Sequence, residues 1–261
     1  MKTKITKSPE IADNVIVLDK DNSEDLSEHY LQDKIIVLDD FADVSPYQDS
    51  QIRNRNNAQV GTKIPVEQLI KKPQILFRNA NHVSAPLKNL MDKSVEFIYN
   101  RFKGFNDDVI RMFYDGTLPQ PIKDQICLRF NLIDKQEDMH FDTYKGPDAL
   151  RMFVNLDSQP RVWRTSYNQN AALRKLSKKS PNDYFDRSDN LAKILNRQVL
   201  YDYKKNKNKT AYHEFEFAPG AMWICNSKKV SHQVVKGRRV FVLSRVLPID
   251  QEAAHGFKFK L

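Results

Sequence analysis

The chain of 261 residues has few of the residues and runs that mark several common protein classes. Seven glycines and no visible repeat period argue against glycine-rich phosphate-binding loops and against solenoid folds. The longest apolar runs, such as Ile35 to Leu38, are far shorter than the roughly 18 residues that a membrane-spanning helix needs. The basic segment from Met1 to Pro9 is followed by no apolar run, so it does not resemble a secretory signal. We therefore expect a soluble protein.

Cysteine is also scarce, and Cys127 and Cys225 are its two instances. Both lie in apolar stretches that read as strands, and their spacing matches no metal-binding pattern. Cysteines in such surroundings are usually reduced and buried, as in cytoplasmic proteins. A disulfide in an extracellular protein is the less favoured alternative.

Positive charge is abundant and unevenly placed along the chain. The net charge is +9 and the pI is about 9.3, which indicates an anionic partner: nucleic acid, a membrane surface or a phosphorylated substrate. The stretch from Arg161 to Lys209 holds 13 Lys or Arg and 4 Asp or Glu, and this surplus of 9 equals the net charge of the chain. We expect this stretch to face the anionic partner, with a solvated charged loop as the alternative.

Strand signals dominate the second half of the chain. Eight short segments are apolar or alternate between apolar and polar residues, and turn residues bound them, a pattern typical of a double-sheet jelly roll. The gap between the fourth and fifth segments predicts an insert at 168–209, with helical stretches around 171–176 and 191–203. The predicted strands are 125–133, 138–144, 149–156, 161–166, 211–217, 220–226, 229–235 and 238–247.

The first half is predicted to flank this core within one domain of residues 1–261. Residues 1–83 form an N-terminal extension, whose apolar run at 35–38 is expected to be a strand on the edge of the main sheet. Apolar residues at helical spacing predict a helix over 84–104 that packs on the sheet. The jelly-roll core spans 125–247. The fold class expected is mainly β with flanking helices, a double-stranded β-helix with a helical basic insert.

One pattern carries chemistry: His140-Phe141-Asp142, with His232 far along the chain. If both segments are strands, alternation points His140 and Asp142 to one face, and His232 completes a set of two imidazoles and a carboxylate. That set, with the opposite positions open, is the ligand pattern of non-haem Fe(II) oxygenases. The alternative is a His and an Asp that share an ordinary sheet surface by chance, because the tripeptide by itself is a weak signal.

Further segments in the second half resemble the Kdo hydroxylases. The resemblance covers roughly residues 125–247. Kdo hydroxylases are Fe(II)- and 2-oxoglutarate-dependent oxygenases of Gram-negative bacteria that hydroxylate carbon 3 of 3-deoxy-D-manno-octulosonic acid (Kdo) in lipopolysaccharide. The matching segments are Leu150-Arg151-Met152-Phe153-Val154-Asn155-Leu156, Pro160-Arg161-Val162-Trp163-Arg164, and Pro219-Gly220-Ala221-Met222-Trp223-Ile224-Cys225-Asn226-Ser227 followed by Val230-Ser231-His232.

The resemblance implies an iron centre and its co-substrate. The family's iron ligands fall on His140, Asp142 and His232, the same set that strand alternation proposes. The cofactors implied are Fe(II) and 2-oxoglutarate, with ascorbate as a reductant. Dioxygen and 2-oxoglutarate would take the open positions of the metal.

A cation must also hold the far carboxylate of 2-oxoglutarate, because a buried carboxylate is costly unless it is paired and arginine binds it bidentately. Arg161 and Arg164, inside the matching motif, rank first, and Arg245 on the last strand ranks next. Alternation puts the first two on opposite faces, so the sequence leaves both open. Asn131, on the strand before the metal segment, is a further candidate contact to the co-substrate.

The implied substrate is Kdo-containing lipid A. The enzyme would then be cytoplasmic and peripheral at the inner membrane, with the insert 168–209 on the anionic surface and no nucleic acid as partner. A first alternative is another 2-oxoglutarate oxygenase, acting on a protein or nucleic acid, because fold and metal do not fix the substrate. A second is a non-enzymatic jelly-roll module that binds anionic glycans.

Overall fold

The computed structural model describes residues 1–18, 29–30, 32–41, 44, 64–65, 123–130, 134, 136–143, 149–179, 191–201 and 211–246. The helix predicted over 84–104 lies outside these residues.

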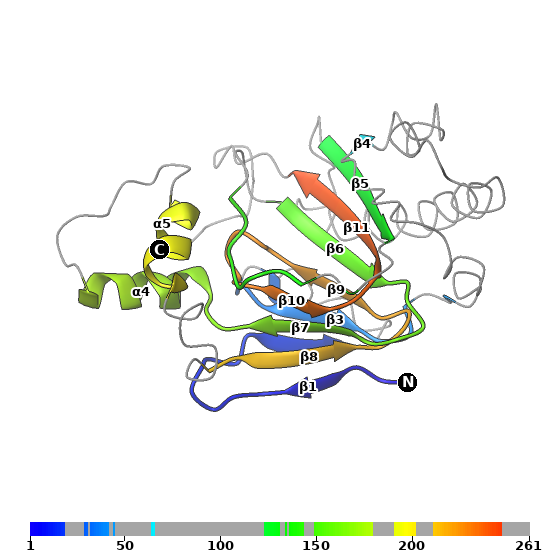
Figure 1. The fold of residues 1–261 in the computed structure, drawn as a ribbon, viewed down its shortest axis with the longest axis horizontal. Helices are drawn as coiled ribbons and strands as arrows, with labels where there is room; N and C mark the ends of the chain where they lie inside the picture. The colour runs from blue at the N-terminus through cyan, green and yellow to red at the C-terminus, as the bar shows by residue number, and fades with distance from the viewer. Residues whose placement is uncertain are drawn as a thin grey trace.

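Two β-sheets form the body of the described chain (Figure 1). One sheet has the strand order β2-β3-β9-β6-β11-β5-β4, and the other has the order β1-β8-β7-β10. In the core, β11 pairs antiparallel with both β5 and β6, and β7 pairs antiparallel with both β8 and β10. This connectivity is that of a jelly roll, as predicted. The core strands are β5 (Lys123–Phe130), β6 (Ala149–Asn155), β7 (Arg161–Thr165), β8 (His213–Phe217), β9 (Met222–Cys225), β10 (Gln233–Lys236) and β11 (Arg239–Val246).

The second of the eight predicted strands, 138–144, is the exception. It forms a single antiparallel bridge, between His140 and His232, rather than a strand. The prediction of a regular strand there was wrong, because the other side of the segment packs against helices and not against another strand. The backbone is still extended enough for side chains to alternate, which is the property that the site needs.

The N-terminal segment extends both sheets. β1 (Lys4–Thr6) pairs with β8 at the edge of the smaller sheet. β2 (Val15–Leu18) runs parallel to β3 (Ile35–Leu38), and β3 pairs antiparallel with β9. The apolar run at 35–38 is a strand as predicted, but it is not at the edge of the sheet, because β3 lies between β2 and β9 and all four of its residues are buried. The short strand β4 (Ile64–Pro65) pairs with β5 on the far edge.

Aromatic side chains fill the space between the sheets. Strand alternation turns Trp163 inward from β7 and Trp223 inward from β9, and their ring centroids are 5.2 Å apart. Phe153 of β6 stacks on Trp223 at 5.2 Å, and Phe217 of β8 stacks on its other side at 4.0 Å. The two sheets therefore close on one aromatic core, which fixes the inner face of each strand.

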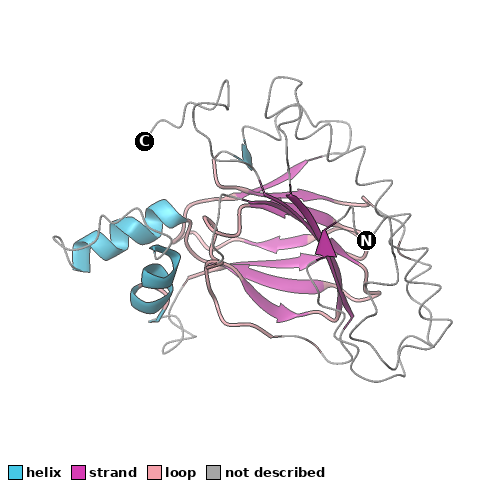
Figure 2. Cartoon of the chain, turned by 90° about the horizontal axis from the view of Figure 1, so that it is seen from above, coloured by secondary structure: helices cyan, strands magenta, loops and turns pink. Residues whose placement is uncertain are grey.

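Two helices lie between β7 and β8 in sequence and stand together at one end of the sheets (Figure 2). They are α4 (Gln169–Lys179) and α5 (Leu191–Gln198), and they occupy the predicted helical insert. Asn168 caps α4, since its Oδ1 accepts a hydrogen bond of 2.8 Å from the Ala171 N–H. No helix within the described ranges is long and apolar enough to cross a bilayer. The apolar faces of α4 and α5 pack with Met139 and Phe141 in a second core. Its other buried members are Ala172, Leu176, Ala192, Leu195, Val199 and Leu200.

The turn between β10 and β11 contains Gly237. Its φ of 146° lies in a region that residues with a side chain rarely adopt. A Cβ at this position would lie 2.6 Å from Nη1 and 2.7 Å from Cγ of Arg161. Glycine is therefore required here both by the backbone and by the packing of the Arg161 side chain.

Candidate metal centre

The predicted ligands come together at the end of the sandwich that the helices cover. His140 and Asp142 leave the extended segment on one side, while Phe141 between them turns into the helical core. His232 lies just before β10. The two histidines are joined through their backbones, with His140 N–H donating to the His232 carbonyl (3.0 Å) and His232 N–H to the His140 carbonyl (2.9 Å).

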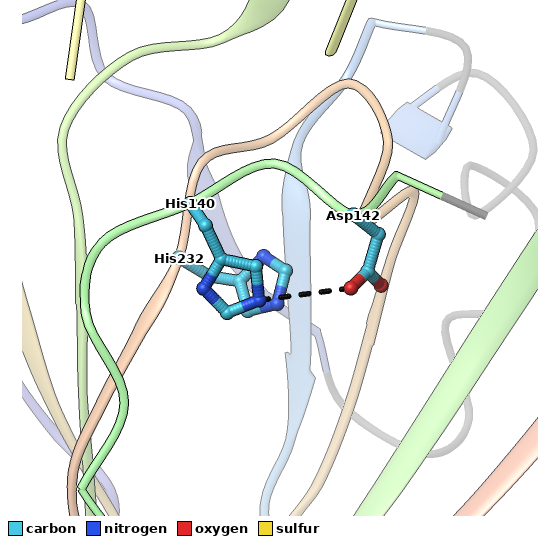
Figure 3. Close-up of side chains that lie close together, drawn as sticks. All are labelled: His140, Asp142 and His232. Carbon is cyan, nitrogen blue, oxygen red and sulfur yellow. Dashed lines mark ion pairs between the residues drawn. The ribbon is translucent and has the colours of Figure 1, made fainter. Parts of the chain in front are cut away.

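The three side chains form a compact donor group (Figure 3). One ligand atom of each of His140, Asp142 and His232 lies within 4.8 Å of the others. The His140 Nε2 atom is 3.6 Å from Asp142 Oδ1, and the two imidazole centroids are 4.5 Å apart. Two nitrogens and one carboxylate oxygen so arranged can coordinate one ion from a single side.

Backbone carbonyls fix the orientation of both imidazoles. Nδ1 of His140 lies 2.7 Å from the Asp138 carbonyl oxygen, and Nδ1 of His232 lies 3.2 Å from that of Val230. A carbonyl only accepts, so in the neutral ring the hydrogen is on Nδ1 and the lone pair is on Nε2. This is the outer-shell arrangement that metal-binding histidines usually have, and the residues present therefore fit a divalent metal ion.

The protonation states suit metal binding as well. Burial lowers the pKa of His232 to about 4, so this ring is neutral at pH 7. Burial would raise the pKa of Asp142, but the hydrogen bond from His140 and the nearby Arg151 guanidinium hold it well below its usual range. For His140, burial is outweighed by Asp142 and the Asp138 carbonyl, and its pKa is raised. The group thus offers a carboxylate and a neutral imidazole without help from the metal.

Arg151 contacts the same carboxylate from β6. Its Nη1 lies 2.5 Å from Oδ2 of Asp142, the oxygen other than the one near His140. The Asp142 backbone is also held, because its N–H donates to the Ser227 carbonyl at 2.9 Å. Arg151 was not among the predicted site residues. The available signal was an arginine in an otherwise apolar strand, because a charge on an inner face needs a counter-charge.

Trp163 forms the apolar wall behind His232. Its ring stacks on the imidazole with centroids 5.2 Å apart and an interplanar angle of 19°. The chain on either side is fixed by Ser231, whose carbonyl accepts from the Thr165 hydroxyl (2.6 Å) and whose Oγ accepts from the Tyr167 N–H (2.8 Å). Packing and hydrogen bonds together leave His232 little freedom.

Arg161 and Arg164, the two arginines of the second matching segment, face different ways. Arg161 shares the buried, inward face of β7 with Trp163 and has an exposed fraction of 2%. Arg164 is on the other face, where its Nε donates to Glu214 at 2.7 Å and its guanidinium lies 4.2 Å from the Tyr212 ring centroid. The sequence left open which of the two arginines points inward, and the structure shows that it is Arg161, on the same face as Trp163.

The structure describes only the backbone of one of the two other candidates, Arg245, and does not describe the second, Asn131. Arg245 is in β11, in register with Asp124 of β5 and Leu150 of β6. Among the described side chains of β11, Val240 and Val242 lie in the inner core. The side chain of Arg245 is not among those described. Asn131 lies outside the described residues.

Cys225 is the cysteine whose side chain is described. It is free and fully buried at the end of β9, in register with Arg151. Burial raises the pKa of its thiol to about 12. This is the reduced, buried state that the sequence predicts for it.

Comparison of the sequence with models of known protein families and with curated proteins finds no match. Solved structures do resemble the chain. The apo structure of the Kdo hydroxylase KdoO, a non-heme Fe(II) alphaketoglutarate-dependent dioxygenase, matches with a TM-score of 0.58 at 15% identity, over 92% of this chain and 90% of that chain. The complex of KdoO with alphaketoglutarate and Fe(III) matches with a TM-score of 0.53 at 16% identity, over 92% of this chain and 90% of that chain. The complex with cobalt(II) matches with a TM-score of 0.53 at 16% identity, over 92% of this chain and 91% of that chain. The chain has the fold of these structures, which confirms the predicted jelly roll.

Proposed function

We propose that this chain is an Fe(II)- and 2-oxoglutarate-dependent dioxygenase that hydroxylates carbon 3 of Kdo in Kdo-lipid A. The observation that carries the proposal is the donor group of His140, Asp142 and His232 within 4.8 Å, with both Nδ1 atoms turned to backbone carbonyls. Such a group holds a metal from one side and leaves positions open for co-substrate and dioxygen. The fold supports the same reading, because the similar solved structures are of a dioxygenase that binds alphaketoglutarate and iron.

In this proposal His140, Asp142 and His232 hold Fe(II), which when bound supplies the oxidation chemistry together with dioxygen and 2-oxoglutarate. The chain supplies geometry and a dry pocket. Trp163 packs on His232 and keeps water from that side of the group. Arg151 holds one oxygen of Asp142, so the other oxygen is presented to the metal.

We assign the far carboxylate of 2-oxoglutarate to Arg161 in preference to Arg164. Arg161 carries a positive charge on the inner face of β7, the face from which Trp163 reaches His232. Arg164 already pairs with Glu214 on the outer face. A carboxylate inside the sandwich needs a cation there, because an unpaired buried charge is costly. Arg245 and Asn131 stay as alternative contacts.

The substrate assignment rests on the motif resemblance, on the likeness to KdoO and on charge. Kdo is a sugar acid on a phosphorylated lipid, so its recognition calls for positive charge beside the metal. The described helices α4 and α5 pack on the ligand segment and expose Arg174, Lys193 and Arg197. We accordingly place the enzyme in the cytoplasm, peripheral to the inner membrane, with the insert 168–209 toward the anionic surface.

The test is to load the purified protein with Fe(II), ascorbate and 2-oxoglutarate and to follow succinate, with and without Kdo-lipid A. We expect one iron per chain, succinate formation, and a sugar product that gains one oxygen by mass spectrometry. His232→Ala should lose iron and turnover. His213→Gln is the matched control, since this imidazole contacts the Ser8 N–H and the Ala12 carbonyl instead.

The two alternatives give different results in the same assay. Succinate formation with no oxygen added to Kdo-lipid A would indicate an oxygenase with another substrate, such as a protein or nucleic acid. Absence of bound iron, or equal iron in the wild type and in His232→Ala, would contradict the metal centre and favour a glycan-binding module.

A further inference from the structure

The carboxamide of Asn196 in α5 forms hydrogen bonds with the backbone of Phe141, which lies between His140 and Asp142 in the ligand segment, residues 139–143. Its Oδ1 accepts a hydrogen bond of 2.8 Å from the Phe141 N–H, and its Nδ2 donates one of 2.8 Å to the Phe141 carbonyl oxygen. Phe141 stands between His140 and Asp142. One side chain thus satisfies both backbone groups of the residue that separates the ligands, from 55 positions away in the sequence.

The sheet geometry explains why these backbone groups need a partner. In an antiparallel pair, alternate residues turn their N–H and C=O toward the neighbouring strand and the others turn them away. His140 exchanges both of its hydrogen bonds with His232, so the N–H and C=O of Phe141 point away from the His232 segment. Buried backbone groups are nearly always paired, since an unpaired one costs free energy. Asn196 takes the place that a neighbouring strand would have.

The side chain of Phe141 is held by the same insert. It is fully buried in the helical core, together with Leu195 and Val199 of α5 and its following turn. On its other side, the ligand segment is held by the backbone bridge between His140 and His232 and by the bond from the Asp142 N–H to the Ser227 carbonyl. Phe141 lies between these two attachments, and its own position depends on α5 through a pair of hydrogen bonds and a buried ring.

We propose that Asn196 is a positioning residue that couples the docking of the helical insert to the geometry of the metal ligands. The inference rests on the proposed metal centre. Without the carboxamide, the backbone at Phe141 loses both of its hydrogen bonds, and the spacing between the His140 and Asp142 side chains is held less tightly. Because coupling between two equilibria is reciprocal, metal binding at the group in turn stabilises α5.

Cobalt(II) is the probe, because its d–d absorption reports ligand geometry as well as occupancy. Asn196→Ala should bind Co(II) about 10- to 100-fold more weakly than the wild type, the usual effect of losing an outer-shell partner, and with an altered spectrum. Asn196→Asp keeps the size and the acceptor but sets an oxygen against the Phe141 carbonyl, so it should be impaired as well. Gln198→Ala, which removes another carboxamide from α5, is the matched control and should behave as the wild type.

Amide hydrogen exchange gives a second readout that does not need metal. In the metal-free protein, Asn196→Ala should speed exchange in residues 139–143, and Gln198→Ala should not. On adding Co(II), exchange in residues 191–198 should slow in the wild type and should respond much less in Asn196→Ala. Thermal unfolding of each variant shows that the measurements are made on folded protein.

The outcomes separate this inference from the metal centre itself. If the wild type binds Co(II) through His232 and Asn196→Ala has the same affinity and spectrum, Asn196 has no positioning role. If His232→Ala binds Co(II) as the wild type does, the metal centre is wrong, and the exchange of residues 139–143 then decides the role of Asn196 alone. Unchanged exchange there in Asn196→Ala overturns the inference, and faster exchange supports it.

Discussion

Arg151 and Asp142 form an ion pair beneath the metal group, with Nη1 and Oδ2 2.5 Å apart and both side chains largely buried. The two oxygens of the Asp142 carboxylate therefore have different neighbours. Oδ2 faces the guanidinium and Oδ1 faces His140, at 3.6 Å from its Nε2. A carboxylate held in this way would offer Oδ1 to a metal ion, while Oδ2 stays paired with Arg151.

Replacing Arg151 by Met should weaken metal binding about tenfold, because Asp142 loses the contact that orients it. In the metal-free protein the same change should lower the free energy of unfolding by about 2 kcal/mol, since the largely buried Asp142 carboxylate loses its counter-charge. Urea unfolding measures the second effect. The double variant Arg151→Met/Asp142→Asn should recover most of that loss, because it leaves no uncompensated carboxylate.

Arg164→Met is the control for this prediction. It removes a pair of similar chemistry with Glu214, but on the outer face where solvent screens it, and about 0.5 kcal/mol is expected. Equal losses for the Arg151 and Arg164 variants would contradict the role given to Arg151.

The two arginines of β7 should differ in their effect on the co-substrate. Arg161→Lys should raise the concentration of 2-oxoglutarate needed for half-maximal succinate formation by about tenfold or more, because lysine lacks the bidentate fork. Arg164→Lys should leave that concentration unchanged, since this side chain faces Glu214 outside the sandwich. The reverse result would move the carboxylate anchor away from the inner face. An effect of Arg245→Lys alone would place it on the last strand.

The grouping of His140, Asp142 and His232 could be predicted from the sequence, because it needs only an extended backbone. His140 and Asp142 share a side wherever the chain alternates, even though the predicted strand there proved to be one bridge. The choice of Arg161 over Arg164 as the carboxylate anchor required knowing which face of β7 points inward. The structure shows this, because Trp163, on the same face as Arg161, stacks on His232. Asn196 could not be predicted, since its contact depends on how the insert folds back on the sheets. Nothing local in the sequence marks that docking.

Cys225 should make the stability of the protein fall at alkaline pH. Its pKa is raised to about 12 in the folded protein, against about 8.5 in an unfolded chain, so the unfolded state loses this proton first. Stability from this group is complete below the unfolded pKa and is lost as pH rises above it, by up to about 1.4 kcal/mol per pH unit. The measurement is urea unfolding from pH 8 to pH 10 of Cys127→Ser and of Cys127→Ser/Cys225→Ala, where the difference isolates Cys225.

A chemical check uses the same pair. In the Cys127→Ser variant, the folded protein should react with a thiol reagent at pH 8 more than about a thousandfold more slowly than the unfolded chain, because the thiolate is the nucleophile. Rapid labelling of the folded variant would show that Cys225 is reached by solvent and would remove the basis of the alkaline prediction.

The basic helices should bind an anionic membrane surface independently of the iron chemistry. Arg174 of α4 and Lys193 and Arg197 of α5 are exposed on the insert that packs on the ligand segment. Each charge near an anionic bilayer contributes on the order of 1 kcal/mol, and the attraction decays over a Debye length of about 10 Å at 0.1 M salt. Changing all three to Gln should therefore weaken binding to phosphatidylglycerol vesicles by on the order of a hundredfold at low salt. Turnover of 2-oxoglutarate without substrate should not change.

The matched control removes the same charge from elsewhere. Lys2, Lys4 and Lys236 are exposed outside the insert, and Figure 1 shows the N-terminus at the opposite end of the molecule from α4 and α5. Their triple change to Gln alters the net charge equally, so it should affect vesicle binding much less if the insert is the docking face. Equal weakening by both triple variants would mean that net charge alone attracts the membrane. No weakening by either would leave α4 and α5 as a scaffold for the metal segment, with their exposed charges serving solubility.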